Sequence, residues 1–595
     1  MSKFGDHTHR GQRRAAAGVG LLSPREKVHL AALSVDKARR DAMARLRRSR
    51  LLRWRYRTGV ADDVLISPTP LRMADPSFLD ELSVGSFGLA GYVCDVGDGS
   101  PFEAEPPSEA WLRELHGFAW LRHLDATIND TSREIARGHV QDWLHLPRAL
   151  QAPGWVPEVT ARRIISWLTH ENLLLDWAEP RDHDAIMLSL EHQVMFLRTS
   201  WLNALDGYPR LLCLIAVVQA DLCVSGRGDD RLAQSQAALA DELDRQILAD
   251  GGHVSRNPWV GVELLLDLLP LKPCFPARER TLEPRIATAM ERMMGMLHHL
   301  RMGDGSLARF NGMGAPEQAT LGAVMAYAAP GHEAQSIGPK GPSGYLRLER
   351  GRTTLLLDAG KPGAFEVSGA AHAGCLSFEL SSGRHLVLVN NGAPGPRHPA
   401  LLPAARATAS HNTLCLNEQS SARLIRNERL EALLGSPPLS HPTRVSCEVS
   451  EEERTIALVA SHDGYLDRTG LVHTRFLALS ADGCQLAGKD RLGALNADMR
   501  LSWDIPFAIH FHLHPAVTAV LSQAGDAVEL ALPDGETWRF TAGGKLISLE
   551  RSIFVADPSG PAVSEQMVLR WVCGGVAEVD WKLEKLPRAE APEAA

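Results

Sequence analysis

The sequence has little of what marks a secreted, membrane-spanning or nucleic-acid-binding protein. Its nine cysteines are odd in number and form no C-x-x-C pair, so we expect reduced core thiols rather than a disulfide framework. No window of ~18 continuous apolar residues is present, and we therefore expect no membrane span. A net charge of -8 over 595 residues is mild, which argues against a nucleic-acid partner.

Several common signatures are also missing. The chain contains no Walker-type, Rossmann or G-x-S-x-G pattern. Its first residues are polar and basic and are followed by a short apolar run broken by glycine, which is not a secretory signal. We therefore expect a cytoplasmic protein, with the periplasm or cell envelope as the alternative. The sequence gives no oligomeric state.

The chain is too long for one core, since a domain usually takes ~100–200 residues. Composition divides it into a basic helix with an extended arm (1–106), a helical domain (107–335), a strand-rich domain (340–586) and a low-complexity tail expected to be disordered (587–595). Arginines crowd the first part from Arg39 to Arg57. That helix would lie either in solvent, with its leucines on the body, or on an anionic membrane surface.

Apolar residues recur at helical spacing from Pro107 to about Leu300. Breaks that carry proline or glycine separate the expected helices, which are 108–121, 132–150, 159–175, 184–204, 209–222, 231–249, 262–269 and 285–300. Ser108 is the expected cap of the first helix. Short connections indicate antiparallel helix pairs, which build either a bundle or an (α/α) toroid.

After Pro342 the period changes to two. Many short strand patterns follow between Tyr345 and Trp571, with turn residues between them. This pattern predicts a large antiparallel β-sandwich. The expected fold class is therefore α+β multidomain, a helical domain followed by a sandwich. A cleft between two such bodies is where small-molecule sites concentrate.

Two histidines each precede a strand pattern, His372 before 376–380 and His411 before 413–416. Neighbouring strand ends would place their imidazoles side by side, and a third ligand would complete a tetrahedral zinc site. The position for that ligand holds Asn390, whose amide oxygen is a weaker zinc ligand than a carboxylate. Zinc held by these three residues and a structural role for the two histidines both remain open from spacing alone.

A polar, glycine-rich turn runs from Asp250 to Pro258 between two expected helices. Its His253, Arg256 and Asn257 suit an anionic, hydroxyl-rich ligand. An arginine binds a carboxylate through two hydrogen bonds, an asparagine amide donates a hydrogen bond to a carboxylate, and a histidine transfers protons near neutral pH. The alternative is a helix-capping turn in which Asp250 and Asn257 satisfy backbone groups.

Three further polar stretches are weaker candidates. The loop 303–312 closes the helical half and carries Asp304 and Asn311, unless it is a plain surface loop. Around the turn Asp463-Gly464, Tyr465 and His473 could be cross-strand partners beside Arg475, with a structural use favoured. His510, His512 and His514 alternate and would share one strand face, where a metal is the less favoured reading.

These pieces together resemble the heparinase II/III family of polysaccharide lyases. The run His372-Ala-Gly-Cys-Leu-Ser-Phe-Glu-Leu and the run His411-Asn-Thr-Leu are similar to the C-terminal region of that family. In the helical half, Leu115-His-Gly-Phe-Ala-Trp-Leu-Arg122 and the turn 250–258 are similar to its bacterial members. The resemblance covers roughly residues 80–575 and implies an (α/α) toroid joined to an antiparallel β-sandwich.

The resemblance implies β-elimination at a uronic acid of an acidic polysaccharide or oligosaccharide. A base removes the C5 proton, a polar group neutralises the carboxylate, and an acid assists the leaving sugar. The candidate catalytic residues are His253, Arg256, Asn257 and Tyr208, and the candidate substrate-binding residues are Asp250, Asp304 and Asn311. The resemblance also implies a zinc ion held by His372, His411 and the residue at position 390.

The chain departs from the family pattern at several of these positions. The zinc aspartate is Asn390, a histidine expected two residues before the first zinc ligand is Ala370, and the tyrosine expected after the D-G-G-H turn is missing, since residues 259–261 read Trp-Val-Gly. Two functions follow as expectations. One is a lyase acting on a uronic-acid-containing glycan, and the other is a non-catalytic glycan-binding or cell-envelope protein on the same scaffold.

Overall fold

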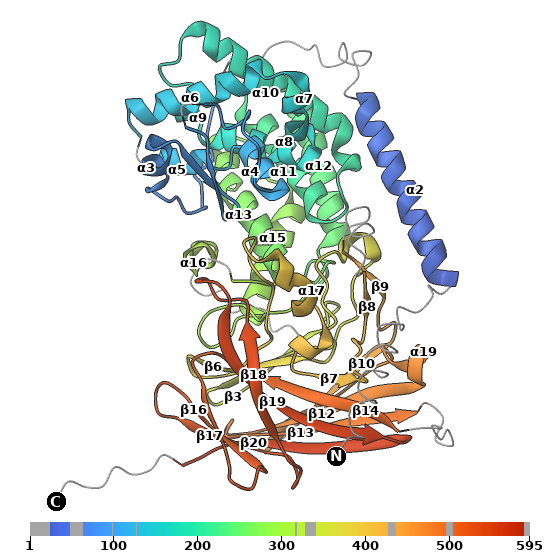
Figure 1. The fold of residues 1–595 in the computed structure, drawn as a ribbon. Helices are drawn as coiled ribbons and strands as arrows, with labels where there is room; N and C mark the ends of the chain where they lie inside the picture. Colours follow the sequence, from blue (N-terminus) through green and yellow to red (C-terminus); the bar gives the residue numbers. More distant parts are fainter. Residues whose placement is uncertain are drawn as a thin grey trace, which may run out of the picture.

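The computed structural model describes residues 24–47, 63–97, 99–126, 128–315, 318–327, 341–425, 436–494 and 504–587. A helical region is followed along the chain by a region of antiparallel sheets, and the two lie one above the other (Figure 1). The predicted join between the domains, at 335–340, and all of the predicted tail 587–595 except its first residue lie outside the described residues. No described helix is long and apolar enough to cross a bilayer.

The N-terminal part contains one long helix and a small hairpin. Helix α2 (Pro24–Arg47) runs beside the helical region (Figure 1), and the arginines predicted to continue it, from Arg48 to Arg57, lie outside the described residues. Strands β1 (Ser86–Leu89) and β2 (Tyr92–Asp95) pair antiparallel. This hairpin lies within the stretch 1–106, for which the sequence predicts a helix and an extended arm.

The longer helices of the next region, from α4 to α15, fall close to the ranges that the sequence periodicity predicts, whereas α3, α14 and α16 lie outside those ranges. In chain order they are α3 (Phe78–Ser83), α4 (Glu109–Gly117), α5 (Leu121–Asp125), α6 (Asp130–His145), α7 (Arg148–Gln151), α8 (Pro157–Thr169), α9 (Glu171–Leu174), α10 (Pro180–Ser200), α11 (Tyr208–Cys223), α12 (Asp229–Gln246), α13 (Pro258–Leu268), α14 (Cys274–Ala277), α15 (Pro284–His299) and α16 (Gln318–Ala326). Ser108 caps α4 as expected, since its side chain accepts the N–H of Trp111.

Helix α11 forms the centre of the helical region. All its residues from Leu211 to Cys223 are buried, as expected of a helix that is apolar on every side. It packs against α8, α10, α12 and α13. A second cluster of buried aromatic residues, among them Trp111, Trp120 and Trp143, fills the space under α4, α6 and the β1–β2 hairpin.

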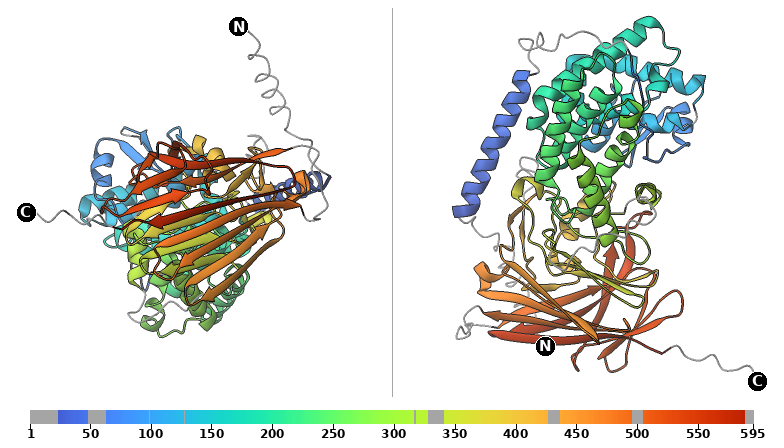
Figure 2. Two further views of the ribbon diagram at one scale, coloured as in Figure 1. Left: turned by 90° about the horizontal axis from the view of Figure 1, so that it is seen from below. Right: turned by 180° about the vertical axis from the view of Figure 1, so that it is seen from behind.

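The sheets are antiparallel and come in three main layers. The first layer has the strand order β3 (Tyr345–Arg350), β4 (Thr353–Asp358), β5 (Phe378–Ser382) and β6 (His385–Leu388). The second layer has the strand order β18 (Ser548–Phe554), β19 (Ala562–Cys573), β14 (Ile505–His512) and β7 (Leu414–Leu416). The third layer has the strand order β10 (Val445–Glu452), β11 (Thr455–His462), β12 (Leu471–Ser480), β13 (Gln485–Ala494), β20 (Val576–Lys585), β17 (Thr537–Thr541), β16 (Ala527–Ala531) and β15 (Thr518–Leu521). The third layer is the broad sheet at the base of the molecule (Figure 2).

The three layers share one apolar core. Strand β12 alternates buried and half-buried residues along its whole length, so one of its faces lies on that core. Phe378, Phe511 and Trp581 come from the three different layers and meet there, with ring centroids 5.8 Å apart between Phe378 and Trp581 and 4.9 Å apart between Phe511 and Trp581. The predicted β-sandwich is thus held by contacts between layers.

The prediction that Tyr465 and His473 are cross-strand partners is wrong. His473 on β12 pairs in register with His462 on β11. The connection between the two strands contains a short helical turn, α19 (Leu466–Thr469), and Tyr465 lies immediately before that turn. Asp463-Gly464 therefore leads into a longer loop instead of closing a tight hairpin.

Candidate functional site

The turn Asp250–Pro258 lies where the helical region meets the sheets. Asp250 accepts hydrogen bonds from the N–H and the hydroxyl of Ser343, at 2.8 and 2.6 Å, and so ties the turn to the chain entering β3. Gly251 has a φ of +85°, and a Cβ there would lie 1.9 Å from the carbonyl oxygen of Arg292. Only glycine fits that position, which explains part of the D-G-G-H motif.

Both ring nitrogens of His253 form hydrogen bonds within the protein. Nδ1 accepts the N–H of Ser255 at 3.1 Å, and Nε2 lies 2.7 Å from Oε1 of Gln246. The amide nitrogen of Gln246 donates to Gly207 and Glu242, so its oxygen is the acceptor and Nε2 of His253 carries the proton. The imidazole is 5% exposed, and burial lowers its pKa to about 3. It is therefore neutral, with no nitrogen left for a substrate.

Arg256 joins the two regions. Its Nε donates to the carbonyl of Ser343 at 2.7 Å, one terminal nitrogen donates to the carbonyl of Gly360 at 3.0 Å, and the other forms an ion pair with Asp358. Its guanidinium carbon lies 4.7 Å from the ring centroid of Tyr345. The fork that was predicted to hold a substrate carboxylate holds a carboxylate of the protein instead.

The amides of the predicted site also serve the fold. Oδ1 of Asn257 accepts the N–H of Trp259 at 3.0 Å and caps α13, which is the capping alternative left open by the sequence. Nδ2 of Asn311 donates to the hydroxyl of Tyr345 and to Asp358, at 2.9 and 3.1 Å, and this side chain is 3% exposed. Asn311 thus helps to hold Asp358 in place for its ion pair with Arg256.

Asp304 stays within its own loop. Its Oδ1 accepts the N–H of Ser306 at 2.9 Å and the hydroxyl of the same residue at 2.7 Å. This is the local side-chain-to-backbone bonding that closes a turn. The structure gives it no contact with the Asp250–Pro258 turn.

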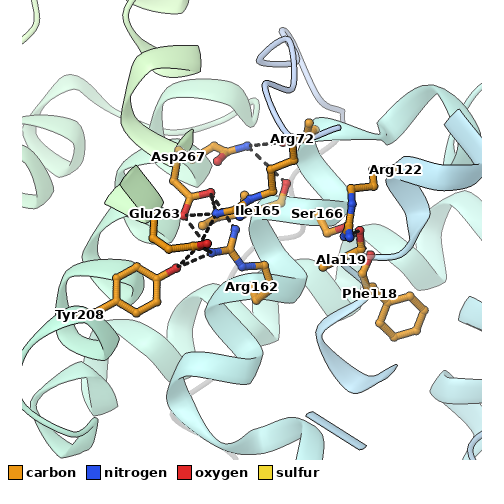
Figure 3. Close-up of polar contacts among 12 residues, drawn as sticks. Arg72, Phe118, Ala119, Arg122, Arg162, Ile165, Ser166, Tyr208, Glu263 and Asp267 are labelled. Atoms are coloured by element: carbon orange, nitrogen blue, oxygen red, sulfur yellow. Dashed lines mark hydrogen bonds and ion pairs between the residues drawn. The ribbon is translucent and has the colours of Figure 1, made fainter. Parts of the chain in front are cut away.

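Tyr208 belongs to a different cluster, drawn in Figure 3. Its hydroxyl accepts a hydrogen bond from Arg162 at 2.7 Å and donates to Glu263 at 3.2 Å. Arg162 also pairs with Asp267 at 2.7 Å. Burial raises the pKa of the Tyr208 phenol well above its ordinary value, so at neutral pH it stays protonated.

Arg72 completes this cluster from the N-terminal arm. It pairs with Glu263 at 2.9 Å and with Asp267 at 3.1 Å (Figure 3). Burial alone would raise the pKa values of the two carboxyl groups, but Arg72 and Arg162 hold both below their ordinary values. The pocket beside the cluster has an empty volume of about 460 Å³, part of it open to solvent, and Arg72, Arg162 and Asp267 line it.

The sequence analysis names Tyr208 as a candidate, but it does not name the other four residues of this cluster, which are Arg72, Arg162, Glu263 and Asp267. Glu263 and Asp267 stand four residues apart on α13, a spacing that puts both carboxylates on one helix face. That signal was available in the sequence. The positions of Arg72 and Arg162, from an arm and from α8, were not.

His372 and His411 lie side by side, as their place before two strands predicts. Their ring centroids are 5.2 Å apart, and they are 5% and 1% exposed. Neither ring nitrogen of either histidine has a hydrogen-bond partner among the described residues. Such orphaned imidazoles would suit a cation.

The third member of that set does not suit a zinc ion. Oδ1 of Asn390 accepts the N–H of Asn412 at 3.0 Å, while its Nδ2 has no partner among the described residues. An amide NH2 has no lone pair to give a metal. The described residues contain no group of three His, Cys, Asp or Glu side chains that could hold a metal ion. The residues present therefore do not fit the zinc that the resemblance implies.

The other histidines form structural networks. His473 lies 2.7 Å from Asp490, whose carboxylate also pairs with Arg475 at 2.8 Å and accepts the indole N–H of Trp581 at 2.9 Å. On β14, the rings of His510 and His512 stack with centroids 5.9 Å apart, so these two share a face as predicted. His512 is bonded through both nitrogens, to Ser552 and to a backbone carbonyl.

Comparison with known proteins agrees with this architecture. Residues 339–582 match the family model "Heparinase II/III-like, C-terminal". Among solved structures, heparinase III has a TM-score of 0.68 at 14% identity, with 90% of this chain and 89% of that chain covered. A mutant of the heparan sulfate lyase HepC from Pedobacter heparinus has a TM-score of 0.59 at 16% identity, with 99% and 92% covered.

The fold is thus of the heparinase III type, a helical region followed by antiparallel sheets, and the predicted fold class is confirmed. The region 339–582 belongs to the heparinase II/III-like C-terminal family. Over most of its length the chain is also similar to FtsZ-localized protein C of Caulobacter vibrioides (strain NA1000 / CB15N). That protein is 28% identical over 529 residues, which are 87% of this chain and 89% of the relative.

Proposed function

We propose that this chain is a non-catalytic protein of the heparinase II/III-like fold that works with FtsZ at the bacterial division site. The observation that carries the first half of the proposal is the state of His253. A base or acid must reach its substrate through a hydrogen bond. Both nitrogens of His253 are already bonded inside the fold, at 3.1 and 2.7 Å.

The remaining members of the predicted catalytic set support the same conclusion. Arg256 is bonded through its Nε and both terminal nitrogens, and the hydroxyl of Tyr208 lies between Arg162 and Glu263. Loss of one general acid or base usually costs ~10²–10⁴ in rate, so loss of the whole set leaves little lyase chemistry. A β-elimination lyase on a uronic-acid glycan is the alternative function.

The second half of the proposal comes from FtsZ-localized protein C, which is alignable over 87% of this chain. We propose that similarity over this length reflects a shared cellular location. That location agrees with the cytoplasmic protein expected from the sequence. The lyase-like fold also suggests glycan binding, so a glycan array belongs beside the partner test.

The test is co-sedimentation of the full chain with FtsZ from the same organism. We expect the chain in the pellet when GTP is present and filaments form, and in the supernatant when GDP replaces GTP. The same protein on uronate-containing glycans should give no new ultraviolet absorbance from an unsaturated product. Absence from the FtsZ pellet would reject the partner, and turnover of a glycan would reject the non-catalytic assignment.

A further inference from the structure

The two buried histidines lie on loops that backbone hydrogen bonds tie together. His372 lies in the loop before β5, His411 before β7, and Asn390 directly after β6. The N–H of Ala373 donates to the carbonyl of Arg406 at 2.9 Å, and the N–H of Asn391 donates to that of Ser410 at 3.1 Å. These hydrogen bonds hold the loop of His372 and the residues after β6 beside the segment that carries His411.

The amide of Asn390 has one allowed orientation. Its Oδ1 faces the N–H of Asn412, and the opposite orientation would place two donors face to face. Asn412 is itself fixed, because its Nδ2 donates to the carbonyl of Phe378 at 2.8 Å and its Oδ1 accepts the N–H of His512 at 2.6 Å. The NH2 group of Asn390 is consequently the end that has no hydrogen-bond partner among the described residues.

Among the described residues, no carboxylate joins the two imidazoles in a group that could hold a metal ion. Glu379 is the acidic residue in contact with Asn390, whose N–H it accepts at 2.9 Å. Its second oxygen faces Arg309 at 3.3 Å. Two imidazoles alone fall short of the three or four protein ligands that a zinc ion needs.

We propose that Asn390 is the residue that keeps the His372–His411 pair free of zinc, and that a carboxylate at this one position turns the pair into a zinc site. Asparagine and aspartate have the same shape. One carboxylate oxygen would accept the N–H of Asn412 as Oδ1 does now, and the other would stand where Nδ2 stands. Two imidazoles and one carboxylate oxygen would then be the three protein ligands of a zinc site, with the fourth position left to water.

The experiment compares the full-length protein with Asn390→Asp. Each is incubated with zinc, freed of excess metal by gel filtration and analysed for bound zinc. We expect no zinc above a chelator-treated control in the unchanged protein and about one ion per chain in Asn390→Asp. Asn390→Asp combined with His411→Ala should lose that ion. Asn391→Asp, which changes the neighbouring buried amide, is the matched control and should bind none.

Thermal unfolding gives a second measurement that does not depend on metal counting. A buried carboxylate without a counter-charge destabilises the fold, so the Tm of Asn390→Asp should be lower than that of the unchanged protein in chelator. Zinc should restore it while leaving the unchanged protein unaffected. If the variant folds poorly, expression with and without zinc replaces this measurement, and a soluble yield that depends on zinc supports the proposal.

Either of two results would overturn the proposal. One is about one zinc ion per chain in the unchanged protein that is lost in His411→Ala. The other is an Asn390→Asp variant that binds no zinc and whose Tm, or soluble yield, does not respond to zinc.

Discussion

At the scale of single residues, the predicted site illustrates why polar groups in a loop do not by themselves make a site. The sequence predicts that His253, Arg256 and Asn257 lie on one turn, and in the structure they do. His253 and Asn257 bond to residues close to them in the sequence, whereas Asp358, the partner of Arg256, is 102 positions away. A single sequence shows which polar side chains a loop carries, but it does not show which distant residues they bond to.

Arg256 gives a stability prediction. Arg256→Ala leaves Asp358 buried without its cation, and breaking a buried pair in this way costs about 3–5 kcal/mol. We expect the free energy of unfolding in urea to fall by that amount. Arg539→Ala removes an exposed partner of Glu529 and should change it by about 0–1 kcal/mol. A loss in Arg256→Ala no larger than in this control would contradict the structural role.

At the scale of elements, the sequence predicts more than it does at the site. Helical spacing places α4 to α15, and the change to a period of two marks the start of the sheets at β3. These patterns are local, because burial of one face repeats along each element. The order of strands in the sheets is not local. For example, β13 pairs with β20, and no periodicity reveals that pairing.

The N-terminal arm is an element whose role became visible only in the structure. Residues 63–75 run along the helical region, where the N–H of Leu65 donates to Cys223 and the N–H of Ser225 donates to Asp63, at 2.7 and 2.9 Å. Arg72 anchors the far end of this segment on α13. The arm thus lines one side of the pocket beside the cluster of Tyr208, Arg162, Glu263 and Asp267, whose contacts are drawn in Figure 3.

Arg72→Ala should loosen the arm without unfolding the helices. We expect faster amide hydrogen exchange at Leu65 and Ser225, by about tenfold for each 1.4 kcal/mol of lost anchoring. Arg113→Ala removes a partner of Glu158 on a half-exposed surface and serves as the control. Unchanged exchange at Leu65 in Arg72→Ala would show that the backbone bonds alone hold the arm.

At the scale of the whole molecule, buried histidines set the pH dependence of stability. Burial lowers the pKa values of His116, His253, His411 and His512 to about 3. In the unfolded chain a histidine titrates near 6.5. Below that pH the unfolded state binds more protons than the folded state, so stability falls as the pH falls.

Each such histidine lowers the free energy of unfolding by about 1.4 kcal/mol per pH unit between pH 6.5 and its folded pKa. We therefore expect the Tm to be nearly constant from pH 7 to 8 and to drop steeply between about pH 6 and 4. Differential scanning calorimetry across this range measures it. A Tm that is flat down to pH 4 would mean that these imidazoles reach solvent in the folded state.

We propose that this scaffold does not perform lyase chemistry, and ultraviolet absorbance on uronate-containing glycans is the measurement that decides it. The panel should include heparan sulfate and the uronate polymers of bacterial envelopes, with an active heparinase III as the positive control. With this chain we expect no increase in absorbance over the enzyme-free blank. An increase that His253→Ala or Arg256→Ala abolishes, in variants that remain folded, would contradict it.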